Sequence, residues 1–205
     1  MTISRRDVAL ALAGTICALG GTLLFGWWQV DGPGASRQPA RSKNLPLHFY
    51  KMDFSLIDHS GRVVRPIDWI GRPTLVFFGF TYCPDVCPTT LSNITGWLEE
   101  LGDEAVRLRA AFITVDPERD NVQSMADYVS YFHPSIIGYT GGPDQIAEAA
   151  RMFRVKYEKV FTKDDYTMNH TASVFVYDKL GEFVSIIDYH EPQEYAVPKI
   201  RRALS

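Results

Sequence analysis

The chain is poor in cysteine and has no block of basic residues, and both absences limit what it can be. It has three cysteines among 205 residues, and a soluble part of roughly 150 residues can bury a core without disulfide staples. Lysines and arginines form no cluster and the formal net charge is -3, which argues against nucleic acid as a partner. We find no internal repeat. The composition therefore indicates one ordinary domain plus an extension.

The N-terminal segment contains a long apolar run, Val8 to Val30, without a charged side chain. At about 1.5 Å per residue it is long enough to cross a hydrocarbon core of about 30 Å. Arg5 and Arg6 precede the run, and a pair of tryptophans lies at its far end. This pattern predicts a transmembrane anchor over residues 8–30, with residues 1–7 in the cytoplasm and everything after the anchor outside.

Three alternatives to an uncleaved anchor stay open. A cleaved signal peptide would have a shorter apolar run and a clear small-x-small site after it. A twin-arginine export signal matches only at Ser4-Arg5-Arg6. A lipoprotein anchor at Cys17 is disfavoured by the bulky Ile16 before it, so we interpret Cys17 as a small hydrophobic residue.

The rest of the chain divides into a flexible linker over residues 31–46, rich in Gly, Pro, Ser and Arg, and a folded domain over residues 47–205. In chain order the predicted elements of the domain are a β-hairpin over 54–64, a buried strand over 73–80, a helix over 88–101, a strand over 106–115, a helix over 120–132, a short strand over 136–139, a helix over 144–153, a hairpin of two strands over 172–177 and 183–188, and a last helix from 191 to about 200. Alternating strands and helices predict an α/β sandwich around a mostly parallel or mixed sheet.

Two of the three cysteines follow the buried strand directly, in the segment Cys83-Pro84-Asp85-Val86-Cys87-Pro88. A cysteine pair between a buried strand and the next helix is thioredoxin-like. Cys87 is expected near the helix N-terminus, where the helix dipole favours a thiolate. The spacing alone leaves a metal site, a redox pair and a structural pair open, and an oxidising compartment would tend to join the two thiols as a disulfide.

A histidine offers a third donor to this pair. His170 precedes the apolar strand that begins at Ala172, in a loop expected to face the cysteine loop. Redox thioredoxins place a proline at about this position, whereas no proline occurs between Thr162 and Glu191. Two thiolates and one imidazole form a soft ligand set suited to copper. The alternatives are that His170 merely caps the loop, or that zinc binds with a water as the fourth ligand.

With these residues in place, the chain resembles the Sco (SenC) family of copper-binding proteins. The resemblance covers about residues 47–200 and is carried by Phe78 to Pro88, by Val115 to Asp120, and by His170 before Thr171-Ala172-Ser173. It implies a thioredoxin-like sandwich, with a central mixed sheet flanked by helices, an N-terminal β-hairpin and one N-terminal transmembrane helix.

The resemblance also implies a function. Copper, as Cu(I) or Cu(II), would be bound by Cys83, Cys87 and His170, and the protein would assist assembly of the copper A centre in subunit II of cytochrome c oxidase. The implied partners are that subunit, an upstream copper donor and the membrane. The protein would be a metallochaperone rather than an enzyme, with a thiol–disulfide reductase that keeps the copper A cysteines reduced as the alternative.

Two further expectations complete the assignment. The N-terminus lacks the Arg/Ser-rich transit region of a mitochondrial import signal, so we expect a bacterial inner membrane with the domain in the periplasm. A peroxidase-like thiol enzyme would place a threonine three residues before the reactive cysteine, whereas Thr81 lies two before Cys83.

Other residues near these motifs have simpler interpretations. Asp85 is expected to solvate the loop or cap the helix, Asp120 to cap the following helix, and Met168 to pack in the interior. The segment from Asp116 to Asp120 is expected to be structural, with partner contact as the alternative. The four other histidines are expected on the surface or in loops: His48, His59, His133 and His190.

Overall fold

The structure of the protein is a computed structural model that describes residues 45–205, of which Pro46–Ser205 form one compact unit. The predicted anchor over residues 8–30 and nearly all of the predicted linker lie outside the described residues. Among residues 45–205, no helix combines the length and the apolar character needed to cross a bilayer.

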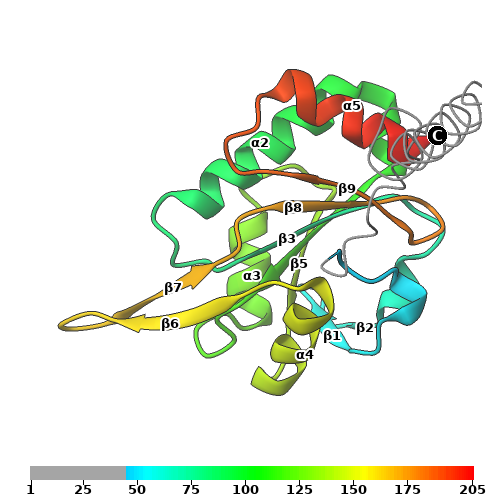
Figure 1. Cartoon of the computed structure of the whole chain (residues 1–205). Coiled ribbons are helices and arrows are strands. Elements are labelled where there is room, and N and C mark those ends of the chain that lie inside the picture. The colour runs from blue at the N-terminus through cyan, green and yellow to red at the C-terminus, as the bar shows by residue number, and fades with distance from the viewer. Residues whose placement is uncertain (1–44) are drawn as a thin grey trace, which may run out of the picture. The chain divides into compact units, whose positions relative to one another are not determined.

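A seven-stranded mixed sheet forms the centre of the domain, in the order β2-β1-β5-β4-β3-β8-β9 (Figure 1). The strands are β1 Leu56–Asp58, β2 Val63–Val64, β3 Thr74–Gly79, β4 Arg109–Thr114, β5 Ile136–Thr140, β8 Val174–Tyr177 and β9 Phe183–Ile187. β3, β4 and β5 run parallel, and the flanking pairs are antiparallel. The predicted mixed sheet and its N-terminal β1–β2 hairpin are therefore confirmed.

Helices cover both faces of this sheet (Figure 1). They are α2 Val86–Leu101, α3 Val122–Val129, α4 Pro143–Phe153 and α5 Gln193–Leu204, with short 3-10 helices η1 Phe49–Lys51, η2 Pro66–Trp69 and η3 Gly102–Arg107. Phe77 and Phe78 are neighbours on β3 and so point to opposite faces. Phe77 stacks on Phe112, which contacts Tyr128 of α3, whereas Phe78 packs against Phe153 of α4.

Every element predicted for residues 54–200 is present, but several boundaries differ. Helix α2 begins at Val86, before the second cysteine, and β4 begins only at Arg109 because η3 occupies the preceding residues. The N-cap of α3 is Asn121, whose side chain accepts a hydrogen bond from the Ser124 N–H at 3.0 Å. The prediction that Asp120 caps this helix is therefore wrong, because its carboxylate is buried and bonded elsewhere.

The sequence prediction missed one hairpin altogether. Strands β6 Tyr157–Phe161 and β7 Tyr166–His170 pair antiparallel and form a separate two-stranded sheet, seen as an extended arm in Figure 1. Its residues are mostly half-buried or exposed, so no continuous apolar run marks it. The hairpin matters because its last residue, His170, was expected in a loop and lies instead at the end of β7.

The end of β3 and the start of α2 approach each other closely at Gly79. A Cβ atom at this position would lie 2.8 Å from Cys87 Sγ and 2.8 Å from a ring carbon of Phe112. Both neighbours are fully buried, so neither can move without disturbing the core. The absence of a side chain at Gly79 therefore leaves the space that the Cys87 thiol occupies.

We predict that Gly79→Ala lowers the free energy of unfolding by about 1–3 kcal/mol, because the added methyl group overpacks this site. The measurement is chemical denaturation of the two proteins side by side. The matched control is Gly96→Ala, in the interior of α2, where the new Cβ would meet only a Gln193 oxygen at 3.8 Å. That control should instead gain about 0.5–1 kcal/mol from helix propensity. A Gly79→Ala protein as stable as the original would contradict the packing argument.

Candidate metal centre

The two thiols lie at the carboxyl end of the central strand β3, where open α/β sheets gather their functional groups. Cys83 is half-buried in the loop after β3, and Cys87 is fully buried in the first turn of α2. The backbone N–H of Cys87 donates a hydrogen bond to Cys83 Sγ at 3.4 Å. Both cysteines are free thiols. The helix start thus directs a donor at Cys83 and favours its thiolate.

The β6–β7 hairpin brings His170 to the same place. Its Nε2 lies 3.5 Å from Cys87 Sγ, and the ligand atoms of Cys83, Cys87 and His170 all lie within 4.8 Å of one another. The rings of Phe77 and Phe80 meet the imidazole edge-on, with centroids 6.1 Å and 5.9 Å away. Aromatic packing from β3 and from the residue that follows it therefore holds the ring in place.

A backbone contact determines which nitrogen of His170 faces the thiols as a ligand. The Nδ1 atom lies 3.0 Å from the carbonyl oxygen of Thr171. A carbonyl oxygen can only accept, so Nδ1 carries the hydrogen and donates it. The lone pair of the neutral ring is then on Nε2, directed toward the sulfurs, which is the arrangement that metal-ligating histidines adopt.

The two thiols share their protons unequally. The hydrogen bond from Cys87 is the main reason that the pKa of Cys83 falls to about 4 despite burial, with further help from the backbone N–H groups of Asp85 and Cys87. The same hydrogen bond, together with burial and the adjacent negative charge, raises the pKa of Cys87 far above its usual value. At neutral pH the pair therefore consists of one thiolate, on the more accessible Cys83, and one thiol, on the buried Cys87.

The donor set fits a single soft metal ion. Bonds of about 2.0–2.3 Å, the lengths known for zinc, place sulfur and nitrogen donors around one ion about 3.5–4 Å apart. The three donors here are already within 4.8 Å, so small side-chain rotations can close the set. Two sulfurs and one imidazole favour copper over hard cations such as magnesium or calcium. Among residues 45–205, no other group of histidine, cysteine and carboxylate side chains converges in this way.

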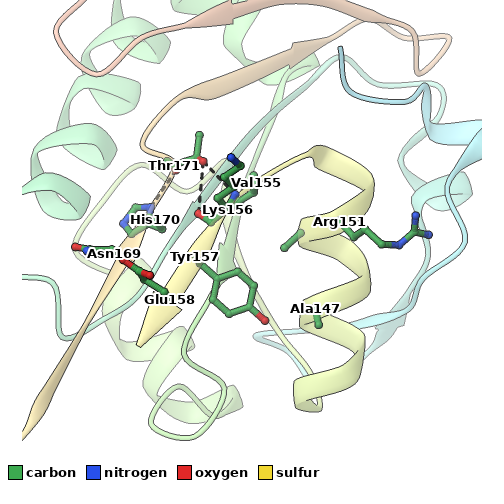
Figure 2. A pocket seen from close by; sticks show the side chains of 10 residues that line it. Ala147, Arg151, Val155, Lys156, Tyr157, Glu158, Asn169, His170 and Thr171 are labelled. Carbon is green, nitrogen blue, oxygen red and sulfur yellow. Dashed lines mark hydrogen bonds between the residues drawn. The ribbon is translucent and has the colours of Figure 1, made fainter. Parts of the chain in front are cut away.

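Two hollows border the imidazole. A cavity of about 240 Å³ opens beside Cys83, between the Cys83–Val86 segment and β7, and His170 forms part of its wall. Figure 2 shows a second and larger hollow of about 750 Å³ between α4 and the base of the hairpin, which His170 and Thr171 also border. A ligand from outside can thus approach Cys83 and His170 through the smaller cavity without unfolding the site.

The remaining predicted residues have structural roles. Asp85 stands at the N-cap of α2, but its carboxylate makes no capping bond and accepts from the Thr89 hydroxyl at 3.3 Å. Met168 is buried, as expected for packing. Three of the other histidines accept backbone N–H groups in loops, and the fourth is exposed; in chain order they are His48, His59, His133 and His190.

Asp120 has a role that the sequence prediction did not find. This fully buried carboxylate accepts hydrogen bonds from the N–H and the hydroxyl of Thr81 and from the hydroxyl of Thr114. Burial raises its pKa despite these bonds. Asp120 thereby fastens the start of the cysteine loop to the end of β4. The available signal was an aspartate in the short loop between a buried strand and a helix, a position that also suits a helix cap.

Comparison with known proteins places this architecture in a family. The SCO1/SenC family model matches residues 43–205. The mouse "Protein SCO2 homolog, mitochondrial" is 39% identical over 184 residues, which cover 87% of this chain and 69% of the mouse protein. The bovine counterpart is also 39% identical, over 158 residues, and the match covers 75% of this chain and 59% of that protein.

Solved structures agree with the sequence relatives. The structure of Bradyrhizobium japonicum ScoI with copper bound has 41% sequence identity and a TM-score of 0.69, and the match covers 78% of this chain and 99% of that one. BsSco, described as a member of the Sco family of cytochrome c oxidase assembly proteins, has a TM-score of 0.59 at 20% identity, with coverage of 78% and 95%, and supports the fold alone. With its thioredoxin-like sandwich and this match over the whole described domain, the chain belongs to the SCO1/SenC family.

Proposed function

We propose that the protein is a membrane-anchored copper chaperone that assists assembly of the copper A centre in subunit II of cytochrome c oxidase. The convergence of Cys83 Sγ, Cys87 Sγ and His170 Nε2 within 4.8 Å carries the proposal. The copper bound by a relative with 41% identity supports the choice of metal. The choice of process rests on membership of the SCO1/SenC family, since the Sco family is described as one of cytochrome c oxidase assembly proteins. Cys83, Cys87 and His170 are the proposed ligands.

Copper in this proposal is a cargo that passes between proteins by ligand exchange. Cys83 is the more accessible thiol and lines the cavity above the site, so an incoming thiolate or imidazole can reach a copper ion there first. The buried Cys87 and His170 would hold the ion until the new bond has formed. Stepwise exchange of this kind never releases free copper.

The proposed location is the bacterial inner membrane, with the copper-binding domain in the periplasm. It rests on the apolar run from Val8 to Val30 and on the two arginines before it. A tether raises the effective concentration of the domain near an integral membrane partner. The further partners of this proposal are an upstream copper donor and the oxidase subunit itself.

A second function, reduction of a disulfide in the oxidase subunit, is favoured by the low pKa of the accessible Cys83. The Cys83 thiolate would attack one sulfur of the target disulfide and release the other as a thiolate. Cys87, on losing its proton, would then attack Cys83 Sγ and free the second target sulfur. Two electrons would pass to the target, and a Cys83–Cys87 disulfide would remain.

The experiment that separates the two functions follows the copper itself. Full-length protein, loaded with Cu(I) in detergent, is mixed with the oxidised or the reduced apo copper A domain of subunit II. We expect the metal to appear in the reduced partner. Formation of partner thiols without any arrival of copper would instead establish the reductase and overturn the chaperone proposal.

Loss of the imidazole should weaken copper binding. We predict that His170→Ala lowers the affinity for Cu(I) by at least about tenfold. Removing only a hydrogen-bond partner of a metal ligand commonly lowers metal affinity by about that much, and this variant removes the ligand itself. A competition titration against a chromophoric chelator measures the change. The control is His190→Ala, which removes an exposed histidine outside the site and should bind copper as the original chain does. Equal affinity in the two variants would remove His170 from the ligand set.

Copper binding should also release about one proton from the thiol pair. The free pair keeps one proton, on Cys87, whereas both sulfurs bind copper as thiolates. The affinity for Cu(I) is therefore predicted to rise about tenfold per pH unit between about pH 7 and 8.5. Calorimetry in two buffers with different ionisation enthalpies counts the protons. A pH-independent affinity, with no proton released, would mean that the pair is not the copper site.

A further inference from the structure

The side chain of Arg119 lies between the two segments that supply the proposed ligands. Its guanidinium carbon is 4.8 Å from the ring centroid of Tyr82 and 3.8 Å from that of Tyr166. Tyr82 directly precedes Cys83 in the cysteine loop, and Tyr166 is the first residue of β7, the strand that ends in His170. One planar cation thus stacks on both ligand-bearing segments, a contact that cation–π attraction favours.

Hydrogen bonds fix Arg119 in this position. Its Nε donates to the carboxylate of Asp116 at 2.5 Å, and its Nη1 donates to the carbonyl oxygen of Tyr166 at 3.1 Å. The Tyr166 hydroxyl donates to the same carboxylate at 2.9 Å, which closes a ring of contacts. Asp116 is 1% exposed and the Arg119 side chain 16%, so water screens these interactions poorly.

The hairpin needs such an attachment. It forms a two-stranded sheet of its own, and an isolated two-stranded hairpin is only marginally stable. Beside the stack, the ammonium of Lys159 lies 4.2 Å from the Tyr166 ring and pairs with Glu118 at 2.6 Å. The segment Asp116–Arg119 therefore holds both strands of the hairpin, on the same edge of the domain as the thiols.

We propose that Arg119 is a positioning residue for copper binding: by stacking between Tyr82 and Tyr166 it keeps His170 within coordinating reach of the thiols. The inference rests on the proposed function, because it concerns the same three ligands. Arg119 itself touches none of them. Its effect is to preorganise the site, so that binding does not have to order the hairpin first.

A double-mutant cycle on the full-length protein in detergent tests the inference. Cu(I) affinity is measured for the original chain, Arg119→Met, His170→Ala and the double variant. We expect Arg119→Met to weaken binding about 10- to 100-fold, as removal of outer-sphere contacts does. In the His170→Ala background, the same change should have almost no further effect. Equal losses in both backgrounds, or no loss in either, would overturn the inference.

The cycle also separates this inference from the proposed function. If His170→Ala lowers the affinity and Arg119→Met does not, only the role of Arg119 fails. If His170→Ala leaves the affinity unchanged, the proposed ligand set fails, and the positioning role fails with it.

The matched control is Arg62→Met. Arg62 donates to Asp58, which is 2% exposed, so this variant also deprives a buried aspartate of its arginine, but in the β1–β2 hairpin. It should bind copper as the original chain does. A loss comparable to that of Arg119→Met would show a general effect of stability and would count against a positioning role.

Two milder variants keep the test decisive if Arg119→Met folds poorly. Tyr82 is 64% exposed, so Tyr82→Leu removes one ring of the stack without opening the core, and should weaken binding about two- to fivefold. Arg119→Lys keeps the charge but loses the planar stacking surface. Compared with Arg119→Met, it should therefore restore stability more fully than copper affinity. If both variants fold and bind Cu(I) as tightly as the original chain, the inference is overturned.

Discussion

Cys87 Sγ and His170 Nε2 lie 3.5 Å apart although the two residues are 83 positions apart in the chain, and the other features of the site depend on this contact. The sulfur is placed by the start of α2, which packs closely against β3 at Gly79. The imidazole is placed by the end of β7 and by its hydrogen bond to Thr171. Two independent elements thus converge on one point, and each must be held rigidly for the donors to stay in reach.

Electrostatics at this point explain why a cation suits it, and the sulfur donors explain why a soft cation is preferred. The thiolate of Cys83 and the buried carboxylate of Asp120 both lie close enough to Cys87 to oppose a negative charge on its sulfur. The free protein reduces the repulsion by keeping a proton on Cys87. A monovalent copper ion would replace that proton with a charge shared by both sulfurs and would relieve the same repulsion. Metal binding and proton release are therefore one linked equilibrium.

Much of the fold could be predicted from the sequence because its strongest signals are local. The buried run of β3 and the cysteine pair that follows it predicted the central strand, the following helix and the side of the sheet where function gathers. The β6–β7 hairpin could not be predicted in the same way, since its strands cover little of the core and carry polar residues on both faces. Asp120 was misassigned because an aspartate before a helix is ordinarily a cap, and only its burial against Thr81 excludes that role.

The sequence by itself determined the ligand types, the thiol spacing and the α/β order of the domain, because residue identity and hydrophobic periodicity are local properties of the sequence. The sequence also predicted that His170 faces the thiols, but tertiary structure alone decided the 3.5 Å approach of its Nε2 to Cys87, which nitrogen faces the sulfurs, and that the two sulfurs share one proton. Tertiary structure also decided the place of Arg119 between two tyrosine rings. Distances and shared protons of this kind arise only when remote segments are packed together in a medium that screens charge poorly.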